Sequence, residues 1–187
     1  MSSLRVISGT ARGRKLRTVP GDSTRPITDR TKESLFNIIG GDIVGASFLD
    51  VFGGTGSVGI EALSRGAAFA RFLDLQQQAV RTIRANLEHT GLLEHAEVLR
   101  IDSFKYLGMV PDRQFEYMYI APPQYQTLWL RALGVIDSQP GWLSPDAWVI
   151  VQIHPKEYEA TTFEHLELFD RRQYGSTLLL FFQVKES

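Results

Sequence analysis

Three aspartates, Asp50, Asp74 and Asp102, each lie where a short apolar run ends. Runs of this length, bounded by turn residues, are typical of strands buried inside a parallel sheet. In open sheets of this kind, ligands bind beside the carboxyl ends of the strands. We therefore predict that the three carboxylates meet at one edge of a sheet and line a ligand site there.

A glycine loop follows the first of these aspartates. Phe52 is followed by Gly53, Gly54 and Gly56, and an amphipathic helix then begins. Glycines let a loop backbone adopt positive φ and approach a ligand closely. The loop also matches the dinucleotide fingerprint G-x-G-x-x-G, but the Asp50 carboxylate would repel a pyrophosphate. It would suit a ligand with an ammonium group and no phosphate, such as S-adenosylmethionine. A glycine turn that binds nothing is the remaining alternative.

Asp74 and Asp102 suit other parts of such a ligand. Asp74 lies 18 residues after Gly56, a suitable spacing for a carboxylate that accepts hydrogen bonds from ribose hydroxyls. Asp102 is expected further along the same edge, where it can reach a base. A single acid of this kind is more often a cap or a turn residue, so the prediction depends on all three occurring together.

A second motif, Ala121-Pro122-Pro123, follows the apolar run 115–120. Two consecutive prolines fix φ and remove two backbone donors, which makes a rigid corner. Such a corner can direct a backbone carbonyl at a bound molecule, although Pro-Pro is also common in loops without a binding role.

The elements that would position these residues alternate between strand and helix. Strands are predicted at 48–52, 69–73, 96–101, 115–120 and 147–153, with a closing antiparallel pair at 163–172 and 177–184. Helices are predicted after Thr28 as N-cap, after the glycine loop, at 76–89 and at 128–137. This order predicts an α/β protein with a doubly wound, mostly parallel sheet. A β-hairpin with a basic tip is expected before it, so we divide the chain into an arm at 1–24 and a domain at 25–187.

Charge is unevenly distributed along the 187 residues. Residues 1–33 contain eight Lys or Arg and three Asp or Glu, a net charge of +5, whereas the rest of the chain carries −6. A basic segment on an acidic body suits contact with nucleic acid, and a solvated terminus is the plainer alternative. The sequence has no cysteine, no apolar run that could span a bilayer and no metal-ligand spacing of its histidines. We therefore expect a cytoplasmic protein without a signal peptide, a metal or a membrane partner.

Taken together, these motifs resemble those of the class I S-adenosylmethionine-dependent methyltransferases, over nearly the whole chain. More narrowly, the sequence resembles the bacterial RsmD family, which methylates a guanine N2 amine in small-subunit ribosomal RNA. The resemblance is carried by residues 5–9 with 12–16, by 25–30 with 33–37, and by 50–65. The first two pairs of segments are specific to that family, whereas the glycine loop indicates only a methyltransferase.

This resemblance implies a Rossmann-like sheet, S-adenosylmethionine as cofactor, and small-subunit ribosomal RNA or the assembling small subunit as partner. The loop and its aspartate would hold the methionine part, the second aspartate the ribose, and the third, with the following serine, adenine. The implied cofactor residues are Thr28, Asp50, Phe52, Gly53, Gly54, Gly56, Asp74, Asp102 and Ser103. The expected RNA contacts are Arg12, Arg14, Lys15, Arg25, Arg30 and Lys32.

The family's fourth motif, an Asp or Asn followed by Pro-Pro and an aromatic residue, holds the target amine. Here the corresponding catalytic stretch is Ala121-Pro122-Pro123-Gln124-Tyr125, with alanine in place of the acid and tyrosine one residue late. The Pro122 carbonyl can still accept a hydrogen bond from an amine. Three hypotheses therefore remain: guanine-N2 methylation of small-subunit ribosomal RNA, methylation of another RNA or amine, and a binding protein with weak or lost catalysis.

Overall fold

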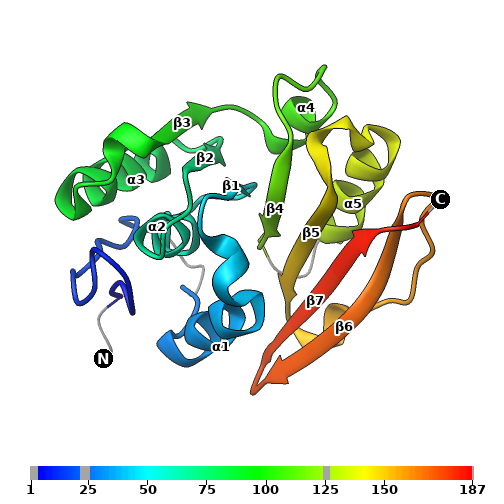
Figure 1. Cartoon of the computed structure of the whole chain (residues 1–187), viewed down its shortest axis with the longest axis horizontal. Coiled ribbons are helices and arrows are strands. Elements are labelled where there is room, and N and C mark those ends of the chain that lie inside the picture. Colours follow the sequence, from blue (N-terminus) through cyan, green and yellow to red (C-terminus); the bar gives the residue numbers. More distant parts are fainter. Residues whose placement is uncertain (1–3, 22–25, 124–126, 187) are drawn as a thin grey trace.

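The computed structural model describes residues 4–21, 26–123 and 127–186, and Arg25, Gln124 and Tyr125 lie outside these ranges. Within them, one sheet of seven strands runs in the order β3-β2-β1-β4-β5-β7-β6 (Figure 1). The strands are β1 (Ser47–Asp50), β2 (Phe69–Asp74), β3 (Ala96–Arg100), β4 (Phe115–Ile120), β5 (Leu143–Ile153), β6 (Leu166–Tyr174) and β7 (Thr177–Val184). The pairs among β1 to β5 are parallel, and β7 is antiparallel to both β5 and β6. The expected fold class is confirmed, whereas the division at residue 24 stays a prediction.

Helices cover both faces of this sheet. They are α1 (Asp29–Ile39), α2 (Ser57–Ser64), α3 (Gln77–Thr90), α4 (Ser103–Leu107) and α5 (Leu128–Ser138), with 3-10 turns η1 (Gly40–Ile43), η2 (Leu93–His95), η3 (Pro140–Trp142) and η4 (Pro155–Glu157). One core contains α1, α2 and α3 with Phe48 and Phe72, and the other contains α4 and α5 with Leu49 and Val149. Because both faces are covered, the central strands are apolar on both sides.

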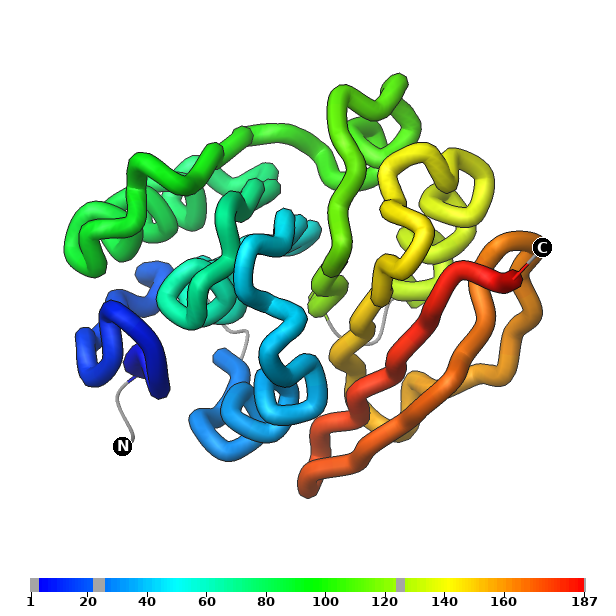
Figure 2. The backbone as a smooth tube through the Cα atoms, in the orientation of Figure 1, coloured from blue at the N-terminus to red at the C-terminus, as the bar shows by residue number. Residues whose placement is uncertain are grey.

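The N-terminal segment 4–17 packs beside α2 and α3, on the opposite side of the molecule from the β6–β7 ribbon (Figure 2). It turns back on itself as expected, with a β-bridge between Arg5 and Lys15. Much of its backbone bonding goes to helices rather than to a second strand. Asn86 of α3 accepts from Arg17 N at 2.8 Å and donates to Arg17 O at 3.1 Å. The segment is therefore packed against α3.

Helix α2 holds the same segment at its turn. Glu61 accepts hydrogen bonds from Ile7 N at 2.8 Å and from Ser8 N at 3.0 Å. Gly9 comes so close to α2 that a Cβ there would lie 1.9 Å from the carbonyl oxygen of Ser64, and its φ is +94°. Both facts require glycine at this position, and together these contacts fix the segment against α2.

Candidate active site

The glycine loop joins the end of β1 to α2 in a tight turn. Gly53 N donates to Leu73 O at 2.7 Å, and Gly56 N donates to Gly53 O at 2.8 Å. Gly56 has φ of +80° and is the N-cap of α2. A Cβ at Gly53 would lie 2.7 Å from the Ile83 side chain. The loop is therefore held against β2 and α3, and it places the N-terminus of α2 at the carboxyl edge of the sheet.

Asp50 is a buried carboxyl beside this loop. The residue is 2% exposed, and among the described residues no hydrogen-bond partner reaches its Oδ1. Burial raises the pKa of Asp50 well above its ordinary value, a hydrogen bond from Gly59 N opposes the shift, and the charge of Asp74 adds to it. A buried carboxyl with an unpaired oxygen is destabilising unless a positive group pairs with it. Asp50 therefore fits the ammonium group of an amino-acid ligand.

Asp74 ends β2 and fixes the loop from the other side. Its Oδ2 accepts from Gly54 N at 2.9 Å, and its Oδ1 accepts from Gln76 N at 2.9 Å. The residue is half-buried, and each carboxylate oxygen has a further lone pair. The structure thus brings Asp74 to the same loop as Asp50, with acceptor capacity left for ligand hydroxyls.

Asp102 and Ser103 have structural partners at the start of α4. Asp102 is exposed and caps that helix, accepting from Lys105 N at 3.0 Å. Ser103 is buried, and its hydroxyl donates to Val51 O. Helix α4 was not expected from the sequence, because five residues are too few for a periodic pattern. Its position keeps Asp102 at the carboxyl edge, while Ser103 fastens the helix to the end of β1.

Two aromatic rings lie between the loop and α4. The ring centroids of Phe52 and Phe104 are 5.9 Å apart in an edge-to-face arrangement, and the Arg131 guanidinium lies 4.0 Å from the Phe104 centroid. Such faces can pack against a flat base. Phe52 was expected at the site, whereas no sequence pattern pointed to Arg131.

Thr28 caps α1 as predicted. Its hydroxyl oxygen accepts from Thr31 N at 3.2 Å, and its hydroxyl donates to the Thr31 side chain at 2.9 Å. This accounts for the threonine as a helix cap, and its expected contact with a cofactor stays a prediction.

The diproline corner begins at the carboxyl end of β4. Asp50 pairs with Tyr119 across β1 and β4, so the corner starts two residues beyond the level of Asp50. Ala121 packs against the core on this face, Pro122 is buried and Pro123 is exposed. The corner and the aspartate therefore belong to the same edge of the sheet. The other two residues of the expected catalytic stretch, Gln124 and Tyr125, lie outside the described residues.

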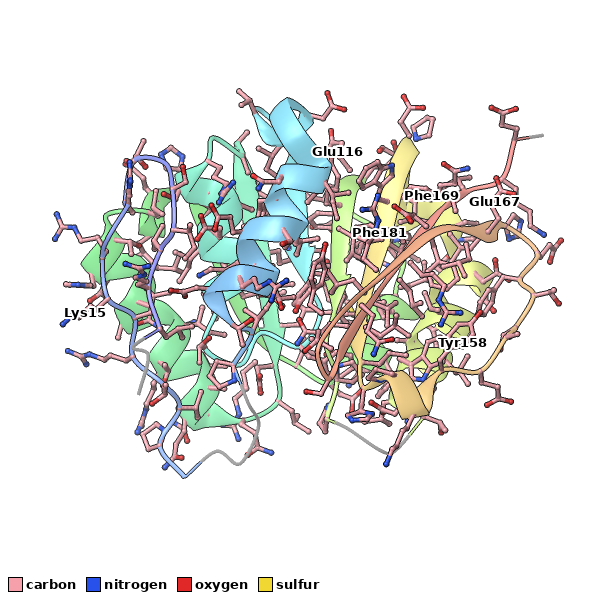
Figure 3. The ribbon with its side chains drawn as sticks, turned by 90° about the horizontal axis from the view of Figure 1, so that it is seen from below. Lys15, Glu116, Tyr158, Glu167, Phe169 and Phe181 are labelled. Carbon is pink, nitrogen blue, oxygen red and sulfur yellow. The ribbon has the colours of Figure 1, made fainter. Side chains whose placement is uncertain are left out.

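Of the expected RNA contacts, Arg12, Arg14, Lys15 and Arg30 are exposed. Lys15 projects away from the body of the protein (Figure 3). These positions are accessible to a large anionic partner, and their binding role stays a prediction.

Lys32 is different, and its prediction as an RNA contact is wrong. Its side chain is fully buried, and its Nζ lies 3.3 Å from Glu61 Oε1. The same nitrogen donates to Ser57 Oγ at 2.9 Å and to Arg5 O at 2.6 Å. Burial lowers the pKa of Lys32, and the Glu61 carboxylate opposes that shift. The basic pattern was misleading because the partner of Lys32 lies in another helix.

Comparison with known proteins shows the family of this chain. The family model described as "Conserved hypothetical protein 95" matches residues 4–183. The chain belongs to this family. One relative, "Ribosomal RNA small subunit methyltransferase D" of Haemophilus influenzae, is 34% identical over 175 residues. The match covers 92% of this chain and 89% of that protein.

Solved structures agree with the family assignment. The protein yhhF of Escherichia coli has a TM-score of 0.87 at 29% identity, covering 98% of this chain and 99% of that one. An RNA methyltransferase from Salinibacter ruber, solved with S-adenosyl-L-homocysteine, has a TM-score of 0.65 at 14% identity, covering 87% and 95%. At that identity the second likeness shows the fold alone.

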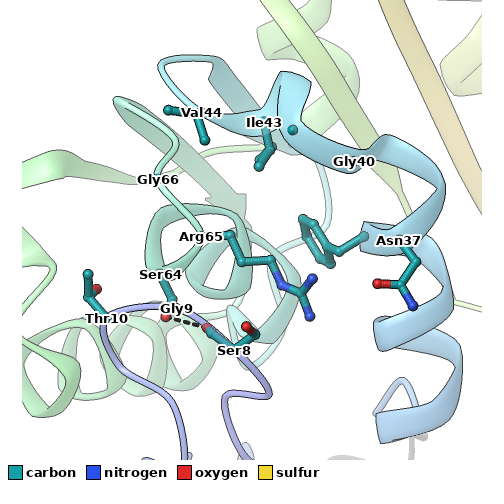
Figure 4. Close-up of a pocket in the computed structure, with 12 residues that line it drawn as sticks. Ser8, Gly9, Thr10, Asn37, Gly40, Ile43, Val44, Ser64, Arg65 and Gly66 are labelled. Atoms are coloured by element: carbon teal, nitrogen blue, oxygen red, sulfur yellow. Dashed lines mark hydrogen bonds between the residues drawn. The ribbon is translucent and has the colours of Figure 1, made fainter.

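A surface depression of about 670 Å³ lies elsewhere in this family member. It is lined by residues that include Gly9, Phe36, Asn37 and Arg65, between the N-terminal segment and the C-terminal ends of α1 and α2 (Figure 4). None of the three aspartates lines it. The depression is therefore separate from the carboxyl edge where the candidate active site lies.

The described part of the chain contains neither a metal-ligand cluster nor a membrane-spanning helix. No group of three or more His, Cys, Asp or Glu residues there could hold a metal ion. In the same residues, no helix has the length and apolar character needed to cross a membrane.

Proposed function

We propose that this chain transfers a methyl group from S-adenosylmethionine to the N2 amine of a guanine in small-subunit ribosomal RNA. The observation that carries the proposal is the buried Asp50 carboxyl, with an unpaired oxygen beside a glycine loop. The names of relatives support the substrate, since those in Haemophilus influenzae and Escherichia coli are called ribosomal RNA small subunit methyltransferase D. A protein that methylates bacterial ribosomal RNA acts where that RNA is made, so we propose the cytoplasm as the location of this chain.

The cofactor side uses the groups around the loop. S-adenosylmethionine supplies a methyl group on a positively charged sulfur. Asp50 pairs with the ammonium group, which satisfies its unpaired oxygen. Asp74 accepts from the ribose hydroxyls with the lone pairs that Gly54 and Gln76 leave unused. Asp102 and the rings of Phe52 and Phe104 would hold the adenine, the rings by apolar contact.

The substrate side uses the diproline corner and the N-terminal segment. The nitrogen lone pair of a guanine amine is delocalised into the ring, so acceptors must orient its hydrogens before it can attack. The Pro122 carbonyl is one such acceptor, and the rigid corner holds it in place. The exposed Arg12, Arg14 and Lys15 bind the RNA backbone, since phosphate contacts supply most of the sequence-independent affinity.

A second candidate is a protein that binds cofactor and RNA without methyl transfer. It is favoured by Ala121, because a methyl side chain offers no polar atom where the family has an acid.

Methyl transfer from labelled S-adenosylmethionine decides between the candidates. We expect label in small-subunit ribosomal RNA, either free or in partly assembled subunits, recovered as N2-methylguanosine after digestion. Large-subunit RNA is the matched control and should stay unlabelled. Cofactor binding without label in either small-subunit substrate would favour the second candidate, and label in another nucleoside would contradict the guanine assignment.

A further inference from the structure

A polar pair that joins β4 to the neighbouring strand β5 lies beside Ala121. Tyr119 of β4 donates a hydrogen bond from its hydroxyl to Oε1 of Gln152 on β5. Ile120 pairs with Val151 in the parallel register of these strands. Gln152 therefore lies level with Ala121 at the carboxyl edge, one strand away.

These side chains share one face of the sheet. Side chains alternate between faces along a strand, so Tyr119 and Ala121 point to the same side, and both pack against the core that contains α1 to α3. The hydroxyl contact brings Gln152 to that side as well. Asp50 pairs with Tyr119 on the other flank of β4. Asp50, Tyr119 and Gln152 thus follow one another across β1, β4 and β5.

The glutamine retains capacity for a further hydrogen bond. A carboxamide oxygen has two lone pairs, and the tyrosine hydroxyl uses one of them. Tyr119 is buried, and burial together with the Asp50 charge raises its pKa well above the ordinary value. The phenol therefore stays protonated and keeps donating at neutral pH. Gln152 is half-buried, so its amide can face the open edge.

We propose that Gln152, oriented by Tyr119, accepts a hydrogen bond from the amine that receives the methyl group, in place of the acid absent at position 121. This inference rests on the proposed function. A guanine N2 amine has two hydrogens, and the acceptors of Pro122 and Gln152 provide one partner for each.

With both hydrogens held, the nitrogen lone pair is available for attack. Transfer forms the nitrogen–carbon bond from that lone pair, and the electrons of the sulfur–carbon bond go to sulfur. The surplus amine proton goes to water, because a carboxamide is too weak a base to take it. Gln152 thus acts as an acceptor in the ground state and in the transition state, with no change in its own protonation.

Removal of the target amine tests the contact directly. The probes are two RNA nonamers of uridine with a single central guanosine or inosine, since inosine lacks the 2-amino group. Their affinities are measured by titration against the protein loaded with S-adenosyl-L-homocysteine. We expect the wild type to bind the guanosine RNA about tenfold more tightly, the size of one or two net hydrogen bonds.

Substitution of the glutamine should reduce that preference. Gln152→Met keeps the side-chain length and lacks the acceptor, so the preference should fall to about threefold, the share left to the Pro122 carbonyl, with the inosine affinity unchanged. Gln152→Glu should restore the preference. Tyr119→Phe is a second variant that keeps the amide but loses its orientation, and an intermediate preference is expected. Gln183→Met, in β7 near the opposite edge, is the matched control and should resemble the wild type.

The outcomes separate this inference from the proposed function. A guanosine preference that is undiminished in Gln152→Met would overturn the inference, as would an equal loss of affinity for both RNAs or the absence of any preference in the wild type. If the wild type fails to methylate ribosomal RNA but shows a preference that depends on Gln152, the contact is supported and the proposed function is contradicted.

Discussion

Two buried carboxyl groups on the same side of the sheet have opposite surroundings. Glu61 is fully buried, and its oxygens lie 3.3 Å from Lys32 Nζ and 2.8 Å from Arg65 Nε. It also accepts from two backbone N–H groups of the N-terminal segment. Asp50 is equally buried, yet one of its oxygens has no partner among the described residues. Because a buried charge must be paired, the first carboxyl is complete as a structural centre and the second is suited to a ligand.

The largest effect on stability should come from removing Glu61, which pairs with Lys32 and Arg65. Glu61→Ala leaves the Lys32 ammonium buried without its carboxylate and removes two acceptors from the N-terminal segment. We expect the free energy of unfolding to fall by about 3–5 kcal/mol, as measured by urea denaturation at neutral pH.

Glu94→Ala is the control for this variant. The Glu94 side chain is 81% exposed, so its removal should change stability by about 0.5 kcal/mol or less. A Glu61→Ala protein as stable as this control would mean that Lys32 finds another partner, and the contrast between the two carboxyls would lose its basis.

Asp50→Asn should show the reverse pattern, with lost ligand affinity and little lost stability. Binding of S-adenosyl-L-homocysteine should weaken by about 1.5–3 kcal/mol, the value of a hydrogen bond to a charged group. Calorimetry measures it, with Asp146→Asn, an exposed acid of β5, as control. Equal affinity in Asp50→Asn and the control would contradict the ammonium contact.

The pH dependence of binding sharpens the same comparison. Burial raises the pKa of Asp50, so the free protein holds a proton there until the pH exceeds that raised value. A positive ligand favours the ionised carboxylate, so affinity should rise with pH, by up to about tenfold per unit, and level off above the raised pKa. The free protein's stability changes the other way, since the contribution of a raised carboxyl pKa is lost as the pH rises through it. Asp50→Asn should make ligand affinity independent of pH over this range. An unchanged slope of affinity against pH would mean that another group causes the pH dependence.

The smallest effect concerns the exposed charges of the segment that Glu61 holds. Arg12→Ala/Arg14→Ala removes two phosphate contacts, so the plot of log affinity for RNA against log salt should flatten by about 1.4–1.8 units. Arg171→Ala/Arg172→Ala, which removes two exposed arginines of β6, is the matched control. Equal slopes in the two double variants would show that the N-terminal segment is only structural.

The sequence predicted best those elements that a local pattern of residues specifies. The bounds of β4 and β7 match the predicted ranges 115–120 and 177–184, because long apolar runs between turn residues specify buried strands. The glycine loop and the strand-end aspartates were found for the same reason, since spacing along the chain determines which edge they reach.

Features that depend on partners distant in sequence could not be predicted. Lys32 looked like an exposed basic residue, because nothing in its own helix indicates the carboxylate that pairs with it. Gln152 looked like an ordinary residue of an apolar strand, and its link to Tyr119 follows from the register of β4 and β5. Asp102 was expected at a base, and its role as the cap of α4 depended on a helix too short to recognise.

The docking of the N-terminal segment determines when that segment can fold. Its hydrogen bonds to Glu61, Ser64 and Asn86 join residues that are 53 to 69 positions apart. During synthesis these partners appear only after α2 and α3 have been made, and contacts of such separation must overcome the entropy of closing a long loop. The residues of this segment, although synthesised before α2 and α3, therefore reach their final place only after those helices. The basic surface that they carry exists only once the domain beneath it has formed.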